Sequence, residues 1–235
     1  MNKTKLLIDA VIKYISGIVL VSLLLFLPAG TVCYPNGWLF MLLLFLPMFI
    51  LGVVLFVKSP ELLEKRLKSK EKRDTQSKVV SVSALAFVVS FIMAGLDYRF
   101  EITIVSDITV IISSFILLIS YGLYAEVMRE NAYLSRTIEV QNNQKVVDTG
   151  LYGIVRHPMY MATIFLFLSI PLILGSWISF TIMLIYPIII IARIKDEEAL
   201  LEGELKGYIE YKNKNMVAIY IGCRTIPYNP VSTTF

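Results

Sequence analysis

Two clusters of ionisable side chains in the C-terminal half of the chain have the residue types that catalysis needs. The first is RHPMY at residues 156–160, which contains His157, the chain's one histidine. The second is RIKDEE at residues 193–198. A charged side chain that is buried without a partner is costly in a protein core or a membrane, so clusters of this kind are candidates for a functional site.

Each cluster also has an ordinary structural interpretation. Arg193 and Glu197 are four residues apart, which is the spacing of a surface ion pair on a helix and carries little energy. Arg156 and His157 could anchor the beginning of a helix at Pro158, because proline is favoured at the first helical position. Taken singly, neither cluster requires a function.

The chain between the clusters favours their coming together. Residues 159–174 and 177–192 are apolar, and only Gly175 and Ser176 separate them. At 1.5 Å per residue each segment makes a helix of about 24 Å, somewhat short of the ~30 Å hydrocarbon core of a bilayer. A tight helical hairpin places the start of its first helix beside the end of its second. We therefore expect residues 156–160 and 193–198 to form one site.

The composition places this hairpin in a membrane protein. The chain is 57% hydrophobic and 17% charged, whereas an ordinary soluble domain is about 45–50% apolar. The net charge of +4 does not indicate nucleic-acid binding, because the basic residues lie in short loops between apolar stretches. Cys33 and Cys223 are far apart and have no partner at metal-ligand spacing, so we expect neither a disulfide nor a metal site.

Four further apolar stretches precede the hairpin, at residues 14–32, 38–57, 79–96 and 108–125. The sequence thus predicts an all-α, polytopic transmembrane bundle of about five to six membrane helices. The basic segment 58–78 predicts cytoplasmic termini and a cytoplasmic site by the positive-inside rule. We interpret this segment as a topological anchor rather than a substrate-binding element. Its Leu62, Leu63 and Leu67 indicate a short amphipathic surface helix.

Two regions of the chain follow from this pattern: N-terminal transmembrane helices at residues 1–128 and a C-terminal core at residues 129–235. Within the core, residues 137–141 and 145–147 alternate apolar and polar side chains around Asn142-Asn143, which predicts a small β-hairpin. Gly150 and Gly153 flank Tyr152, where they either let the backbone approach a ligand or only form a turn of the loop.

The motifs VVDTGLYGIVRHPMYMATIF, LGSW, RIKDEEALL and GYIEY, preceded by RENAYLS, resemble a group of membrane-embedded enzymes. This group comprises the isoprenylcysteine carboxyl methyltransferases and the phospholipid methyltransferases. The resemblance covers about the last half of the chain. It implies S-adenosylmethionine as cofactor, held by C-terminal helices and cytoplasmic segments. The sequence has no GxGxxG motif after a predicted strand, which agrees with that expectation.

The resemblance also implies roles for individual residues. Glu198, with Glu197 beside it, is expected to face the ammonium group of the cofactor, which needs a charged partner away from water. The cofactor pocket is expected to be lined by His157, Pro158, Tyr160, Gly150, Leu151 and Tyr152. Arg193 and Arg156 are candidates to orient a carboxylate acceptor, which needs no general base. An amine acceptor needs a base, for which Glu197 or His157 is available.

We favour a carboxylate acceptor, on a lipophilic or prenylated molecule that enters from the bilayer and its lipids. An N-methyltransferase of phospholipids or other amines stays open. Two other classes also stay open. One is a membrane sterol-type reductase, which would bind NADPH instead of the methyl donor. The other is a non-enzymatic membrane protein such as a small transporter, which predicts ionisable residues near the bilayer midplane, where the sequence has few.

Overall fold

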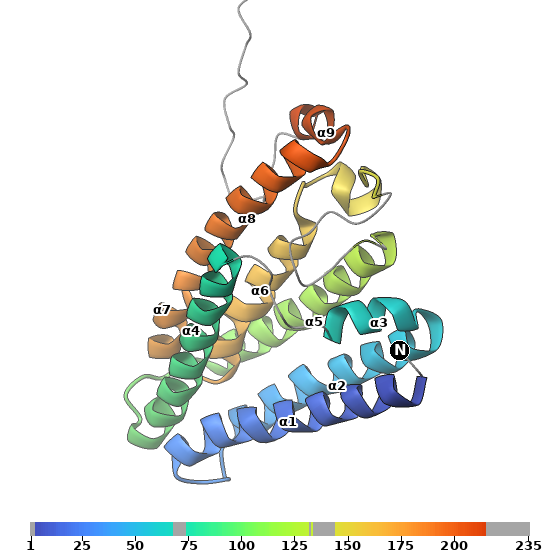
Figure 1. The fold of residues 1–235 in the computed structure, drawn as a ribbon. Coiled ribbons are helices and arrows are strands. Elements are labelled where there is room, and N and C mark those ends of the chain that lie inside the picture. Colours follow the sequence, from blue (N-terminus) through green and yellow to red (C-terminus); the bar gives the residue numbers. More distant parts are fainter. Residues whose placement is uncertain (1–2, 68–73, 132, 134–143, 215–235) are drawn as a thin grey trace, which may run out of the picture.

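The computed structural model describes residues 3–67, 74–131, 133 and 144–214, and the regular structure of these residues is entirely helical (Figure 1). This confirms the predicted all-α class. The elements are α1 (Lys3–Ala29), α2 (Pro35–Lys58), α3 (Pro60–Leu67), α4 (Asp74–Phe100), α5 (Asp107–Glu130), the 3₁₀ turn η1 (Gly150–Gly153), α6 (Pro158–Ile173), α7 (Trp177–Met183), α8 (Ile185–Glu204) and α9 (Tyr208–Lys214).

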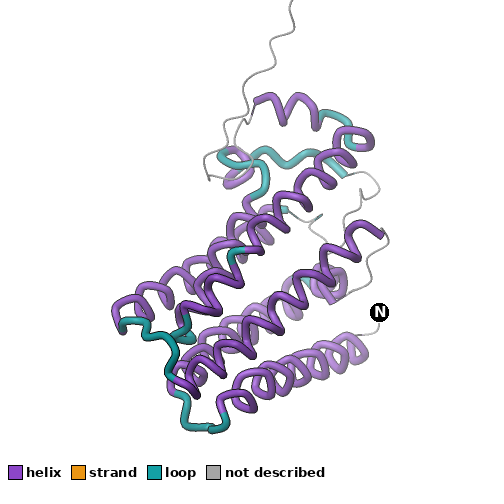
Figure 2. The backbone as a smooth tube through the Cα atoms, turned by 90° about the vertical axis from the view of Figure 1, so that its left-hand side faces the viewer, coloured by secondary structure: helices purple, strands orange, loops and turns teal. Residues whose placement is uncertain are grey.

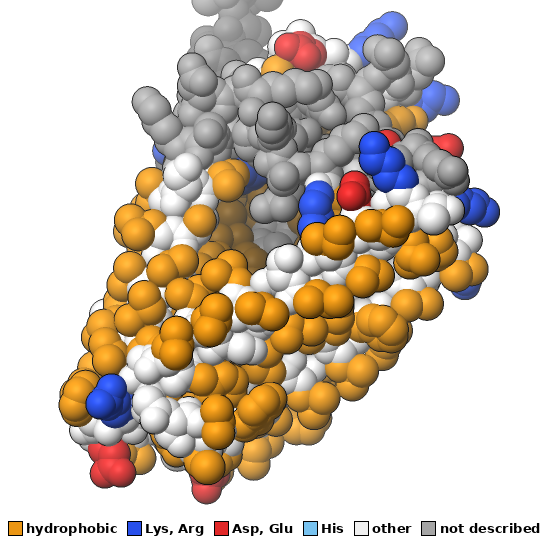
Figure 3. All heavy atoms as spheres, turned by 60° about the horizontal axis from the view of Figure 1, so that its bottom comes forward, with side chains coloured by type: hydrophobic (Ala, Val, Ile, Leu, Met, Phe, Trp, Pro, Cys, Tyr) orange, Lys and Arg blue, Asp and Glu red, His pale blue; other side chains and the backbone are white. Residues whose placement is uncertain are grey.

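Five stretches of the described chain are long and apolar enough to cross a membrane. They lie in α1, α2, α4 and α5 and in the combined length of α7 and α8, while α6 is apolar but shorter, with 16 residues. Large apolar side chains are exposed along all of these helices, as expected for surfaces that face lipid. Figure 3 shows how widely they cover one face of the molecule. The protein is therefore a multi-pass membrane protein, within the predicted range of five to six helices.

The helices of the bundle pack against one another in specific pairs. α1 and α2 form a hairpin, α1 also packs on α4, and α6 runs along α5 (Figures 1 and 2). α4 then contacts α7 and α8 on its other side. Close approach of α4 to α1 depends on Gly95, where an added Cβ would lie 2.6 Å from the carbonyl oxygen of Leu25.

The end of the bundle that holds the loop after α4 is tightly fixed. Asp97 is 1% exposed, and its carboxylate accepts hydrogen bonds from the Thr103 backbone N–H at 2.7 Å and from the hydroxyls of Thr103 and Ser176. Tyr34, also buried, donates its hydroxyl to the carbonyl oxygen of Leu174. These bonds join the α4–α5 loop and the start of α2 to the turn between α6 and α7, so they hold the hairpin in place.

Three details differ from the sequence predictions. α1 begins at Lys3 rather than at residue 14. The basic residues before residue 14 continue the helix, and Lys13 donates to the carbonyl oxygen of Leu67 while its methylene groups lie along the bundle. The predicted helix 177–192 is instead split at Leu184. Pro187 has no N–H to donate to the carbonyl of Met183, which explains the break.

The third difference concerns the predicted β-hairpin. Residues 145–147 are not a strand in the structure, and residues 137–141 lie outside the described residues. Val146 instead packs against the apolar cluster of Leu205, Tyr208 and Tyr211. The alternation that predicted a strand is therefore explained by packing of Val146 against α9 and the residues before it.

Candidate active site

The first cluster lies at the beginning of α6, where Pro158 occupies the first helical turn and His157 is the residue before it. Arg156 and His157 are each 6% exposed. α8 returns along the hairpin and continues to Glu204, so its polar residues lie beside this point. The structure thus brings the two clusters together, as the short turn at Gly175 and Ser176 led us to expect.

Glu198 of α8 is the centre of a buried ion-pair network. Its Oε1 atom is 3.0 Å from Nε of Arg156 and 3.0 Å from Nε2 of His157. Its Oε2 atom is 2.8 Å from Nζ of Lys212 in α9. Because a carboxylate can only accept, the contact with His157 requires the histidine proton to be on Nε2. The network fixes the residue that precedes α6 and ties α9 to α8.

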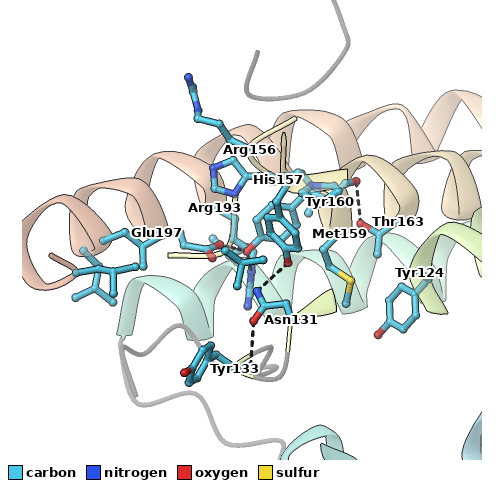
Figure 4. A pocket seen from close by; sticks show the side chains of 18 of the residues that line it. Tyr124, Asn131, Tyr133, Arg156, His157, Met159, Tyr160, Thr163, Arg193 and Glu197 are labelled. Carbon is cyan, nitrogen blue, oxygen red and sulfur yellow. Dashed lines mark hydrogen bonds between the residues drawn. The ribbon is translucent and has the colours of Figure 1, made fainter. Parts of the chain in front are cut away.

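Glu197 belongs to a second network, which Tyr160 completes. Nε of Arg193 donates to the Tyr160 hydroxyl at 3.0 Å, and this hydroxyl donates to Oε2 of Glu197. In Figure 4, Tyr160, Arg193 and Glu197 lie together, while the side chain of Arg156 extends away from them. Arg193 and Glu197 therefore do not form the isolated surface pair that their spacing allowed, because a tyrosine from α6 links them.

These networks border a cavity of about 500 Å³. Its walls come from α3, α4, α5, α6, α8 and α9 and from the chain between α5 and α6. Of the residues singled out in the sequence, seven line it: Tyr152, Arg156, His157, Pro158, Tyr160, Arg193 and Glu197. Glu198, Gly150 and Leu151 are not among its lining residues. The structure therefore directs Glu197 to the cavity and Glu198 to the cations beside it.

Gly150 and Leu151 instead hold the turn that carries Tyr152. The Leu151 N–H donates to Oε2 of Glu130 at 3.0 Å, and Gly150 has φ +52° with a carboxylate oxygen of Glu130 where a Cβ would be. Only glycine fits that position without strain. Tyr152 is then bonded on both sides, because Asn131 donates to its hydroxyl at 2.9 Å and Tyr211 donates to its carbonyl oxygen at 2.8 Å.

Two of the lining residues to which the sequence analysis gave no role have polar groups of particular interest. Tyr208 in GYIEY is 4% exposed, and its hydroxyl is buried without a hydrogen-bond partner in the described structure. Arg66 of α3 comes from the segment that we had interpreted as a topological anchor. A signal for Arg66 was available, since it lies four residues after Leu62 and three after Leu63 and so shares the apolar face of the short helix.

Comparison with known families bears on this site directly. Residues 102–205 match the family described as phospholipid methyltransferase. The match confirms the family predicted from the sequence. The matched segment runs from the loop before α5 through α8, so it includes both clusters, whereas Arg66, Tyr208 and Lys212 lie outside it. No curated protein shows a significant match to the chain. This family match supports the assignment of the protein as a membrane methyltransferase.

Proposed function

We propose that the protein transfers a methyl group from S-adenosylmethionine to a lipophilic acceptor that reaches the cavity from the bilayer, at the cytoplasmic face of the membrane. The main support is the position of the cavity. It lies at the helical hairpin of the phospholipid methyltransferase segment, with ionisable groups on one wall and apolar helix faces on another. A cofactor and a lipid could meet only in a site of this mixed character.

The residues present fit the cofactor. The cavity volume of about 500 Å³ is in the usual range of about 300–1,000 Å³ for ligand pockets. Burial raises the pKa of Tyr208, so its hydroxyl stays protonated and is a donor that a bound ligand would satisfy. Glu197 offers a carboxylate to a cationic group, and His157 and Tyr160 would complete the binding surface. When bound, S-adenosylmethionine supplies an electrophilic methyl group on a sulfonium.

The chain's own contribution is positioning and the exclusion of water. Glu198 holds Arg156 and His157 in one place, and Tyr160 holds Arg193 and Glu197 at hydrogen-bond distance. Side chains whose partners are fixed in this way lose little freedom when a ligand arrives, which favours reaction. Phe87 and Phe167, in contact at 4.6 Å between ring centres, form part of the apolar wall and keep water away from the acceptor.

The charges that line the cavity favour a carboxylate acceptor. Among the described residues that line it, four have cationic side chains, namely Arg66, Lys145, Arg156 and Arg193, and one, Glu197, has a carboxylate. A carboxylate acceptor is already ionised near pH 7 and needs orientation rather than deprotonation. Arg193, which donates to the Tyr160 hydroxyl, is our candidate for that orienting group.

Methylation of an amine is the second candidate, and the description of the matching family favours it. An ammonium acceptor must lose a proton before it can attack. Glu197, which faces the cavity, or His157 would then have to accept that proton. Incubation of lipid extracts with a labelled methyl donor distinguishes the two candidates, because a methyl ester is lost in mild base and a methylamine is not.

Calorimetry with S-adenosylhomocysteine on detergent-purified protein tests the proposal. We expect binding by the unmodified protein and affinity reduced about tenfold or more in Glu197→Gln and in Tyr208→Phe, the loss of one hydrogen bond to a charged or buried group. Glu202→Gln is the control, since Glu202 pairs with Lys212 on the surface. Absence of binding by the unmodified protein, or binding of NADPH in its place, would contradict the proposal.

A further inference from the structure

Arg66 is held at the cavity by the packing of α3. Leu63 is 7% exposed where α3 contacts α1 and α2, and the carbonyl oxygen of Leu67 accepts a hydrogen bond from Lys13. Arg66 lies between these two anchored residues. Its position at the cavity wall is therefore fixed by the N-terminal helices and is not that of a free surface side chain.

In the described structure, no carboxylate lies against the guanidinium of Arg66 as an ion-pair partner. Its guanidinium lies over the ring of Tyr124, 5.3 Å from the ring centre, and Nη2 is 3.8 Å from the sulfur of Met159. Its Nε is buried with no hydrogen-bond partner, and no described carboxylate forms an ion pair with it. Arg66 is partly exposed and keeps its charge, and its buried Nε–H is a donor that a bound anion would satisfy. The missing partner is an anion.

Arg66 and Glu197 act on the same part of the cavity. Both residues line the cavity together with Tyr152. Burial raises the pKa of the Tyr152 hydroxyl to about 12, with Glu197 adding to the rise and Arg66 opposing it. An anion at Arg66 would thus lie near the group that we place beside the methyl donor. It would lie on the side of the cavity formed by α3, α5 and the first turn of α6.

An apolar surface suited to a hydrocarbon chain lies across the same cavity. Val80, Ala84 and Phe87 of α4 line it at spacings of four and three residues, with Val79 beside them, so they form one face of that helix. Figure 3 shows a hollow in the apolar surface of the molecule next to α4. The cavity therefore combines a place for an anion with a place for a lipid chain.

We infer that Arg66 binds the oxyanion of the methyl acceptor, and that this acceptor is an anionic amphiphile whose chain lies against α4. The inference rests on the proposed function. It assigns recognition of the acceptor to a residue of the N-terminal helices, outside the segment that matches the family. The oxyanion is either the carboxylate that is methylated or a phosphate next to a methylated amine, which share the same ionic chemistry.

Thermal unfolding in an uncharged maltoside detergent tests the inference without any need for turnover. We expect dodecanoate or dodecyl phosphate, but not dodecanol, to raise the melting temperature of the unmodified protein. Arg66→Gln should abolish this shift and Arg66→Lys should retain part of it. Arg129→Gln is the matched control, because Arg129 pairs with Glu126 on the surface and does not line the cavity. The anion that gives the larger shift identifies the source of the oxyanion.

Two further measurements separate this inference from the proposed function. Arg66→Gln should bind S-adenosylhomocysteine as the unmodified protein does, and in a methyl-transfer assay its KM for the acceptor should rise about tenfold, the effect of losing a charged hydrogen bond. An anion shift that survives in Arg66→Gln would overturn the inference. So would weaker S-adenosylhomocysteine binding by that variant, which would place the cofactor at Arg66. Failure of the unmodified protein to bind S-adenosylhomocysteine would instead overturn the proposed function.

Discussion

At the scale of residues, the adjacent glutamates of α8 have different surroundings. Successive residues on a helix point about 100° apart. Glu197 consequently reaches the cavity and the Tyr160 hydroxyl, while Glu198 reaches Arg156, His157 and Lys212. We interpret Glu197 as the group that faces ligand and Glu198 as a positioning residue that neutralises the cations around it.

Removal of the Glu198 charge should therefore mainly reduce the stability of the protein. Glu198→Gln leaves the buried guanidinium of Arg156 without its carboxylate, and loss of one partner of a buried ion pair costs about 3–5 kcal/mol. We expect a clearly lower melting temperature in detergent. Glu202→Gln, which removes the other, surface partner of Lys212, should leave the melting temperature within a degree or two. Equal melting temperatures for the two variants would show that the network is not structural.

Removal of the Glu197 charge should reduce activity instead. Glu197→Gln keeps the size of the side chain and can still accept from the Tyr160 hydroxyl, but it removes the charge that we place against the cationic group of the ligand, a charged hydrogen bond of about 1.5–3 kcal/mol, or about 10- to 150-fold. We expect methyl transfer to fall by that factor with little change in melting temperature. Full activity of this variant would remove Glu197 from the reaction centre.

At the scale of elements, sequence patterns predicted the helices and their hairpin but not the exact shape of the site. Long apolar stretches are unambiguous, and the two-residue turn at Gly175 and Ser176 left little choice of geometry. The break at Leu184 was visible in Pro187, but the direction of each glutamate was not, because it depends on the rotation of α8 against α6. Arg66 was missed because a basic segment next to a membrane helix has a simpler explanation, that of topology.

The close packing of α1 against α4 at Gly95 can be tested by substitution. A Cβ at Gly95 would lie 2.6 Å from the Leu25 carbonyl oxygen and 3.0 Å from Cβ of Pro28, so Gly95→Leu forces the two helices apart. Overpacking of this kind costs about 1–3 kcal/mol, which we expect as a lower melting temperature in detergent. Gly122→Leu is the control, since no atom lies within 4 Å of a Cβ there. Similar effects of both substitutions would contradict the close approach.

At the scale of the whole molecule, the residues that line the cavity come from both sides of the predicted boundary at residue 128. Arg66, the apolar face of α4 and Tyr124 line it together with α6 and α8, so the N-terminal helices form part of the site. Sequence reasoning separated the two regions because the family motifs lie in the second alone. A cavity wall needs apolar side chains of the right spacing but no motif, and α4 gives the same pattern as any lipid-facing helix.

The orientation of the molecule can be tested with its two cysteines. Basic residues at 58–78 predict that this segment and both termini are cytoplasmic, which puts Cys33, in the turn before α2, on the opposite side. Cys33 is exposed, and Cys223 lies in the C-terminal segment outside the described residues. In intact cells, a membrane-impermeant maleimide should label the Cys223→Ser variant through Cys33 and should leave the Cys33→Ser variant unlabelled. Permeabilised cells should show labelling of both, which controls for reactivity. Labelling of Cys33→Ser alone in intact cells would reverse the topology and move the proposed site, with Arg66 and Glu197, to the outer face of the membrane.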